Sequence, residues 1–289
     1  MSFKHTVIIG VGAIGASFAH SIKRLGLSER VSGYGRTENV LIKAKDRGII
    51  DDYGLNIKEL CQDADLVVLT SPIVTFIDIV KSFAGYLKKG AIVTDAGSVK
   101  GSLVYDIEEI MPEGIHFVGV HPMAGTEQSG IDASKPSLFE GATVIITPTE
   151  NTNIDALNMI KELWTKIGAK IKILTPEQHD EIISSISHLP HVIAYTLVNA
   201  VFDIGIDNMN YCSNGFLDTT RIAMSSPQMW KDIFLCNKDN ILKHIEVFQK
   251  NLDTLKNCLE NENTEQLLQN LTHAQKLRKD LYKGVKGIS

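Results

Sequence analysis

Short apolar runs rich in β-branched residues alternate with longer amphipathic stretches from the N-terminus to residue 174. The runs have the length and composition of strands, and the stretches between them, such as 13–25 and 74–87, have helical length and spacing. We expect strands at residues 6–10, 64–70, 91–97, 116–122, 142–148 and 169–174. This alternation predicts an α/β fold in which helices cover both faces of a largely parallel sheet.

The strand signal ends after residue 174, and long helical patterns follow. Thr175 and Pro176 form a good helix start, because threonine caps free N–H groups and proline fits the first turn. We place a domain boundary there, between residues 1–174 and an all-α domain of residues 175–289. Residues 240–283 repeat apolar positions at helical spacing, which predicts a helix that packs against the core or against a partner subunit.

Three glycines with the spacing G-x-G-x-x-G, Gly10, Gly12 and Gly15, lie between the first strand and the first helix. In a dinucleotide-binding loop the first permits a tight turn, the second lets the backbone approach a pyrophosphate, and the third allows close packing of helix on strand. A plain tight turn is the alternative, but the strand–loop–helix context favours a Rossmann-like NAD(P)-binding domain over residues 1–174. The residues expected to bind the cofactor are Gly10, Gly12, Ile14, Gly15, Arg36, Thr37, Ser71 and Pro72.

The end of the expected second strand bears on the choice between NAD+ and NADP+. An acidic residue there would bind the ribose 2′-hydroxyl of NAD+, but the segment VSGYGRT, residues 31–37, has Gly35 followed by Arg36 and Thr37. A guanidinium can pair with the 2′-phosphate of NADP+. The sequence therefore favours NADP+ over NAD+, with a solvated surface arginine as the alternative for Arg36.

Composition and charge argue against several kinds of partner. A formal net charge of −5 and a pI near 6.0 provide no broad positive field for nucleic acid or an anionic membrane. The four cysteines lack metal-ligand spacing, so we expect reduced thiols and no metal. No apolar run reaches the roughly 18 residues of a membrane helix, and the chain does not begin with a signal-peptide core. We therefore expect a cytoplasmic protein without a membrane partner.

Polar residues gather in four later segments that a plain nucleotide-binding domain does not need. They are DAGSVK at 95–100, VGVHPMAGTEQSG at 118–130, SHLPH at 187–191 and FLDTTRIAMSSPQMW at 216–230. Together with the glycine loop, and in this order, they resemble the prephenate dehydrogenase family, which includes arogenate and cyclohexadienyl dehydrogenases. The resemblance covers nearly the whole chain.

The resemblance implies oxidative decarboxylation of prephenate to 4-hydroxyphenylpyruvate with NAD(P)+, a step in tyrosine biosynthesis, by a homodimer associated through the helical domain. His121 matches the family's catalytic histidine. An imidazole with an ordinary pKa of roughly 6.5 suits a base that takes the proton of the substrate hydroxyl. Ser98 matches the serine that hydrogen-bonds this histidine, which implies an orienting role.

Prephenate carries two carboxylates, which call for fixed cations and hydrogen-bond donors. Arg221 matches the family's substrate-binding arginine, whose fork geometry suits a carboxylate. Asp218 stands one helical turn before Arg221, at a spacing that would support it. The other residues that match the substrate pocket or its rim are Ser187, His188, His191, Glu127 and Trp230. Core packing is the alternative for Trp230, and we expect Lys100 to be structural or near the cofactor rather than catalytic.

Other activities compete with this interpretation. An arogenate or cyclohexadienyl dehydrogenase would accept a substrate with a side-chain ammonium in place of the keto group. His191 favours prephenate, because an imidazole provides no carboxylate that could pair with this ammonium. A 3-hydroxyacid dehydrogenase would use a lysine of the helical domain, where this chain has SHLPH. A non-catalytic NADP sensor would leave Ser98, His121 and Arg221 unexplained. The sequence does not indicate whether tyrosine inhibits the protein.

Overall fold

The computed structural model of the chain describes residues 2–125, 128 and 130–286. The chain forms two compact units, Met1–Lys238 and Asp239–Ser289. The first unit contains the sheet and most of the helices, and the second contains two long helices. The domain boundary that the sequence places after residue 174 lies inside the first unit and stays a prediction.

Eight strands of the described residues form one sheet in the order β3-β2-β1-β4-β5-β6-β7-β8. Neighbouring strands are parallel except β6 and β7, which are antiparallel. The strands are β1 (Phe3–Ile9), β2 (Ser28–Tyr34), β3 (Asp52–Tyr53), β4 (Leu66–Leu69), β5 (Ile92–Asp95), β6 (His116–Pro122), β7 (Thr143–Thr147) and β8 (Lys170–Ile173). The predicted α/β fold with a largely parallel sheet is confirmed.

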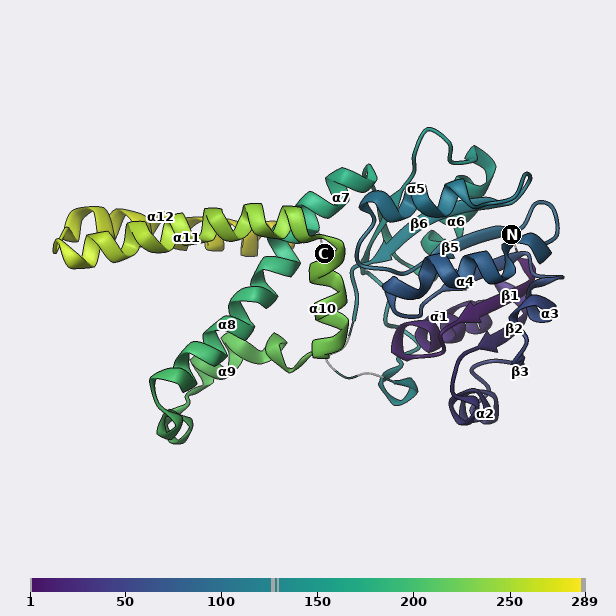
Figure 1. Cartoon of the computed structure of the whole chain (residues 1–289), viewed down its shortest axis with the longest axis horizontal. Coiled ribbons are helices and arrows are strands. Elements are labelled where there is room, and N and C mark those ends of the chain that lie inside the picture. Colours follow the sequence, from purple (N-terminus) through teal and green to yellow (C-terminus); the bar gives the residue numbers. More distant parts are fainter. Residues whose placement is uncertain (1, 126–127, 129, 287–289) are drawn as a thin grey trace. The chain divides into compact units, whose positions relative to one another are not determined.

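Helices cover both faces of this sheet (Figure 1). The helices of the first unit are α1 (Ala13–Arg24), α2 (Glu38–Asp46), α3 (Ile57–Cys61), α4 (Phe76–Phe83), α5 (Gly101–Glu109), α6 (Ile154–Ile167), α7 (Pro176–Ile183), α8 (Leu189–Ile204), α9 (Asn214–Thr220) and α10 (Pro227–Cys236). The second unit is built from α11 (Lys238–Glu260) and α12 (Thr264–Lys286). Within the described residues, no helix combines the length and apolarity needed to cross a membrane.

Alternation along the strands divides the core into two layers. On one face of the sheet, Ile8 and Val68 lie in a cluster with side chains of α1, α2 and α6. On the other face, Val7 and Val67 lie in a cluster with side chains of α3, α4 and α5. All four side chains are at most 1% exposed, as expected for strands that are covered on both faces.

The strands β1, β4, β5 and β6 are parallel neighbours, so their carboxyl ends meet at one edge of the sheet. The glycine loop follows β1, and Ser71 and Pro72 follow β4. Ser98 follows β5, and His121 lies at the end of β6. Ligands bind at this edge in open α/β sheets. The topology therefore gathers the segments in which the sequence predicts cofactor-binding and catalytic residues.

A capped helix opens the helical part of the first unit. The Thr175 hydroxyl accepts the Gln178 N–H, and the Gln178 side chain accepts the Thr175 N–H, which fixes the start of α7 as predicted. A π-helical turn, Ser184–His188, joins α7 to α8, and the Leu189 N–H donates to the carbonyl of Ser184. Pro190 has no N–H for the preceding turn, which accounts for the wider turn at this point.

The stretch 240–283, in which the sequence predicts a helix, contains two helices, α11 and α12, with a break between them. Glu262 between them has a left-handed φ of 51°, and the Asn263 side chain accepts the Gln266 N–H as a cap for the new helix. The polar run between the two helices therefore ends one and starts the other. Leu252 and Leu259 of α11 are more than half exposed in the single chain.

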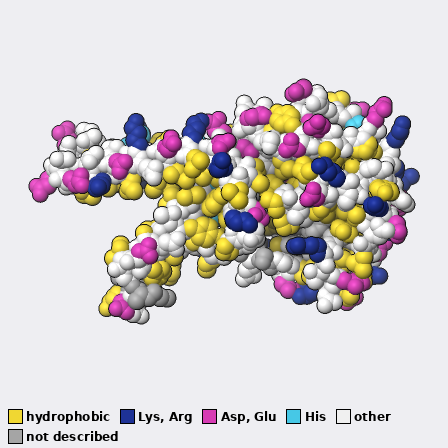
Figure 2. Space-filling model, viewed as in Figure 1, with side chains coloured by type: hydrophobic (Ala, Val, Ile, Leu, Met, Phe, Trp, Pro, Cys, Tyr) yellow, Lys and Arg dark blue, Asp and Glu magenta, His cyan; other side chains and the backbone are white. Residues whose placement is uncertain are grey.

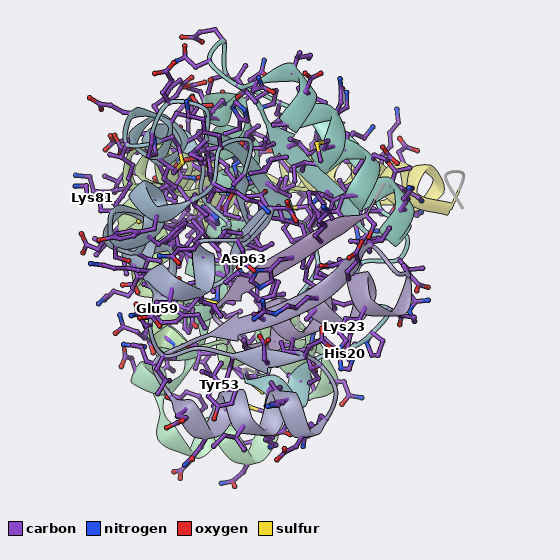
Figure 3. All side chains as sticks on the ribbon, turned by 90° about the vertical axis from the view of Figure 1, so that its right-hand side faces the viewer. His20, Lys23, Tyr53, Glu59, Asp63 and Lys81 are labelled. Carbon is purple, nitrogen blue, oxygen red and sulfur yellow. The ribbon has the colours of Figure 1, made fainter. Side chains whose placement is uncertain are left out.

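A buried histidine near the start of β1 forms a His–Asp pair away from the glycine loop. His5 Nδ1 lies 2.8 Å from Asp63 Oδ1, and His5 Nε2 lies 2.8 Å from Ser32 Oγ. Asp63, labelled in Figure 3, also accepts a hydrogen bond from Arg30 at 3.3 Å. These contacts tie β1 to its neighbour β2 and to the segment before β4.

Candidate active site

The glycine loop has the geometry that a dinucleotide-binding loop requires. Gly10 has a φ of 99°, and a Cβ on it would lie 2.6 Å from the backbone nitrogen of Ser71. A Cβ on Gly15 would lie 2.5 Å from Thr70 Oγ1, so only glycine lets α1 approach β4 this closely. At Gly12 a Cβ would meet no atom within 4 Å, so the space beside its backbone is open.

These features fit the pyrophosphate of NAD(P)+. No described side chain caps the first turn of α1, so its backbone N–H groups are left for an anion. Ile14 packs partly into the core and anchors that turn. Arg36 and Thr37 are exposed directly after β2, the neighbour of β1 in the sheet. The loop can therefore hold the phosphates, and Arg36 is accessible at the same edge of the sheet.

His121, at the end of β6, is buried and paired with a second histidine, His179 of α7. His121 Nδ1 lies 2.8 Å from His179 Nε2, and His179 Nδ1 lies 2.7 Å from Asp180 Oδ1. The two rings meet edge to face with centroids 5.1 Å apart. An ionised carboxylate only accepts hydrogen bonds, so His179 donates from Nδ1 and accepts with Nε2. His121 therefore donates from Nδ1, and its Nε2 keeps a lone pair.

Asp180 is fixed by three neighbouring segments of the chain. The Lys100 backbone N–H donates to its Oδ1 at 2.8 Å, and Asn237 Nδ2 donates to its carbonyl oxygen at 2.9 Å. A Cβ on Gly101 would lie 2.6 Å from its Oδ2, so glycine permits the close approach of α5. The Asp180 carboxylate therefore joins helix α7 to the loop after β5, and its backbone carbonyl joins α7 to the residue that follows α10.

The Lys100 side chain is fully buried in an ion pair with Asp95. Asp95 Oδ2 accepts from Lys100 Nζ and from the Gly97 N–H at 2.8 Å, and its Oδ1 accepts the Val120 N–H at 2.9 Å. The pair thus fixes the loop after β5 against β6, directly beside His121. These contacts support the structural role expected for Lys100.

The histidines of this region share an environment that disfavours their charged forms. Burial holds the pKa of His121 well below its usual value, and nearby His179, Lys100 and His188 lower it further. Burial also lowers the pKa of His179, although the hydrogen bond to Asp180 opposes this effect. Burial lowers the pKa of His188 to about 4. All three imidazoles are therefore neutral at neutral pH, and His121 is able to accept a proton.

His188 and His191 flank Trp230 of α10. The His191 ring stacks on Trp230 with centroids 3.4 Å apart, and His188 meets Trp230 edge to face at 5.9 Å. His191 Nδ1 donates to the carbonyl of Ser187 at 3.0 Å. Asn237 Nδ2 donates to His188 Nδ1 at 3.2 Å, so the proton of His188 is on Nε2. Among the described residues, His188 Nε2 and Trp230 Nε1 are buried without a hydrogen-bond partner.

The structure brings some of the predicted site residues together and leaves others apart. His188 is near enough to His121 to lower its pKa, and it joins His191 at Trp230. Ser98 makes no hydrogen bond to His121 among the described residues, and His179 holds the ring through Nδ1 instead.

Two further predicted substrate residues lie in other parts of the chain. Arg221 is exposed and begins the turn Arg221–Met224, which packs against α8. Glu127 lies outside the described residues.

His179, Asp180 and Asn237 were not identified from the sequence as site residues. The signal that could have found the first two is the adjacent His-Asp within TPEQHDE, one turn after a capped helix start. Nothing local marks Asn237, because its partners are 49 and 57 residues away in the sequence.

Comparisons with known proteins identify the family of the chain. Residues 18–180 match the family model of the prephenate dehydrogenase nucleotide-binding domain, and residues 175–273 match that of the prephenate dehydrogenase dimerization domain. A cyclohexadienyl dehydrogenase of Zymomonas mobilis is 35% identical over 280 residues, 96% of this chain and 95% of that protein. A prephenate dehydrogenase of Bacillus subtilis is 33% identical over 285 residues, 96% of this chain and 76% of that protein.

Similarity in three dimensions is equally extensive. The crystal structure of prephenate dehydrogenase from A. aeolicus, in complex with hydroxyphenyl propionate and NAD+, matches with a TM-score of 0.92 and 41% identity. The match covers 97% of this chain and 99% of that chain. As the ordered motifs predicted, the chain belongs to the prephenate dehydrogenase family of NAD(P)-dependent oxidoreductases.

Proposed function

We propose that the protein converts prephenate and NAD(P)+ to 4-hydroxyphenylpyruvate, CO2 and NAD(P)H, in the route to tyrosine. The observation that carries this proposal is the state of His121, a neutral imidazole whose Nδ1 is held by His179 and whose Nε2 keeps a lone pair. It ends β6 at the same edge of the sheet as the glycine loop. A base in that position is what oxidation of an alcohol beside a nicotinamide requires.

The glycine loop would hold the cofactor. Gly12 leaves open space for the pyrophosphate, and the uncapped start of α1 supplies backbone N–H groups. Ile14 of the first turn and Ser71 and Pro72, which follow β4, complete the proposed cofactor contacts. When bound, NAD(P)+ supplies the hydride acceptor.

His121 moves the proton in the proposed reaction. As the ring carbon loses hydride, the O–H bond of its hydroxyl breaks and the proton passes to His121 Nε2. The bond from the ring to the carboxylate then breaks, CO2 leaves, and the electron pair of that bond restores the aromatic ring. The oxygen regains a proton from His121, so the base returns to its neutral form.

The two carboxylates and the keto group of prephenate need donors on the helical side. Arg221 is the proposed carboxylate anchor, since its guanidinium can donate two parallel hydrogen bonds. His188 Nε2 and Trp230 Nε1 are buried donors that lack a partner among the described residues, which supports their assignment to the substrate pocket. Ser187 and His191 are proposed to line the same pocket, and Asp218 to support Arg221.

The residues after β2 favour NADP+. Gly35 leaves no carboxylate to bind the ribose 2′-hydroxyl, and the exposed Arg36 is available for a 2′-phosphate, with Thr37 beside it. A guanidinium–phosphate pair would therefore distinguish NADP+ from NAD+ in this protein.

We further propose that the protein is a cytoplasmic homodimer that associates through its helical domain. The family model that matches residues 175–273 is that of a dimerization domain. Apolar side chains lie exposed along the second unit (Figure 2). Leu252 and Leu259 are among the exposed residues. Exposed leucines at helical spacing are what a subunit interface would cover. Neither nucleic acid nor a membrane is a proposed partner.

Steady-state rates test the proposal. The purified protein is assayed with prephenate and with arogenate, each with NADP+ and with NAD+, by the absorbance of the reduced nicotinamide. We expect the highest kcat/KM with prephenate and NADP+. A higher kcat/KM with arogenate would move the assignment to arogenate dehydrogenase, and a preference for NAD+ would remove the role of Arg36. Absence of turnover with both substrates would overturn the proposal.

A further inference from the structure

Two residues behind His121 take no part in the proton transfer proposed above for His121 Nε2. His179 is fully buried, and Asp180 is 4% exposed. They form a continuous line of hydrogen bonds from Asp180 Oδ1 to His179 Nδ1, at 2.7 Å, and from His179 Nε2 to His121 Nδ1, at 2.8 Å. The line crosses from α7 to the end of β6, which are 58 residues apart in the sequence.

The donors and acceptors of this line allow one arrangement of protons when Asp180 is ionised. Asp180 Oδ1 accepts two N–H groups, from the Lys100 backbone and from His179. His179 Nε2 must then accept, which places the proton of His121 on Nδ1. A neutral imidazole carries one N–H, so Nε2 of His121 is left as the basic nitrogen.

We propose that His179 and Asp180 are positioning residues for the reaction, which hold His121 with its proton on Nδ1 and stabilise the positive charge that forms when Nε2 takes the substrate proton. The inference rests on the proposed role of His121 as the base. The Nδ1 proton stays on His121, hydrogen-bonded to His179, and Asp180 stays ionised throughout. A buried carboxylate oriented in this way stabilises the imidazolium much more than a carboxylate in water would, because the low dielectric strengthens the interaction between the two charges.

The other charged and titratable groups around the two histidines do not replace Asp180. Lys100 faces both rings, but its charge is paired with Asp95 in the loop after β5. His188, which faces them from the start of α8, is neutral and accepts from Asn237. Among the described groups that act on His121 and His179, Asp180 is therefore the one carboxylate that is not paired with a cation.

Asp180→Asn separates the charge from the geometry. An amide oxygen in the place of Oδ1 can still accept from the Lys100 backbone and from His179, so the hydrogen bonds and the fold are retained. The variant loses only the negative charge. Asp63→Asn is the matched control, because it neutralises the carboxylate of the other His–Asp pair, at His5 in β1.

The test is the dependence of kcat and kcat/KM on pH, with prephenate and NADP+. We expect Asp180→Asn to lower the plateau of kcat by about 10- to 100-fold and to move its acidic limb to lower pH by about one pH unit, because the imidazolium loses a stabilising charge. The KM for both ligands should stay within about twofold. Asp63→Asn should reproduce the wild-type profile.

Two outcomes would overturn the inference. An Asp180→Asn enzyme with the wild-type profile would show that the carboxylate has no role. A lower plateau with an unmoved acidic limb would show that Asp180 only supports the structure. Turnover by a His121→Asn enzyme near the wild-type rate would instead contradict the proposed base, so the two failures are distinguishable.

Nitrogen NMR of histidine-labelled free protein gives a readout without turnover. We expect the His121 signals to show a protonated Nδ1 and an unprotonated Nε2 in the wild-type protein, with assignment by loss of the signals in His121→Asn. The opposite tautomer would overturn the positioning role whatever the kinetic result.

Discussion

Acidification is expected to destabilise the protein through His188. Its side chain is fully buried, its Nδ1 accepts from Asn237, and burial lowers its pKa from 6.5 to about 4. Between those two pH values the unfolded chain binds a proton that the folded chain does not. The free energy of unfolding must therefore fall as the pH falls from about 6.5 towards about 4. Above about pH 6.5, His188 causes no loss of stability.

The magnitude follows from the size of the pKa change. Each pH unit within the range removes about 1.4 kcal/mol, so the full range removes roughly 3 kcal/mol and acidification to about pH 5 removes roughly 2 kcal/mol. Domains are stable by only about 5–15 kcal/mol, so the loss is readily measured.

Urea unfolding at about pH 7 and about pH 5, at one protein concentration, measures this loss. His188→Gln is the informative variant, because an amide oxygen can accept from Asn237 but does not titrate. Between the two pH values we expect the wild-type protein to lose roughly 2 kcal/mol more than the variant. An equal loss in both proteins would refute a neutral, buried His188.

Three substitutions test the binding assignments. Gly15→Ala would place a methyl group against Thr70 and should raise the Kd for NAD(P)+ at least about tenfold, and an unchanged Kd in a calorimetric titration would contradict the packing role of this glycine. Arg36→Ala should raise the Kd for NADP+ about tenfold or more and leave that for NAD+ within about twofold, whereas equal effects would remove the reason for preferring NADP+. Arg221→Ala should raise the KM for prephenate about tenfold or more with a smaller change in kcat, and an unchanged KM would place the anchor elsewhere.

Local features made much of the fold predictable. Residues 117–120 are apolar throughout because the sheet is covered on both faces, and the strand at His116–Pro122 has the predicted bounds. The glycine spacing reflects steric demands within one turn, so Gly10 and Gly15 could be interpreted without the rest of the chain. The strand Asp52–Tyr53 was missed, since two residues carry no periodicity.

The site was less predictable because its contacts join distant segments. His121 could be identified from its own motif, but its partner His179 lies 58 residues away on a helix whose start was recognised only as a cap. The hydrogen bond expected from Ser98 to His121 does not occur among the described residues. The helical spacing of apolar positions predicted a helix over residues 240–283, and that pattern did not reveal the break at Glu262.

Turnover of His121→Asn tests the central claim most directly. Asparagine can still donate toward His179, but it offers no basic nitrogen to the substrate hydroxyl. With saturating prephenate and NADP+, we expect kcat to fall by about 10²- to 10⁴-fold relative to the wild-type protein. A kcat within a few-fold of the wild-type value would contradict the assignment of His121 Nε2 as the base.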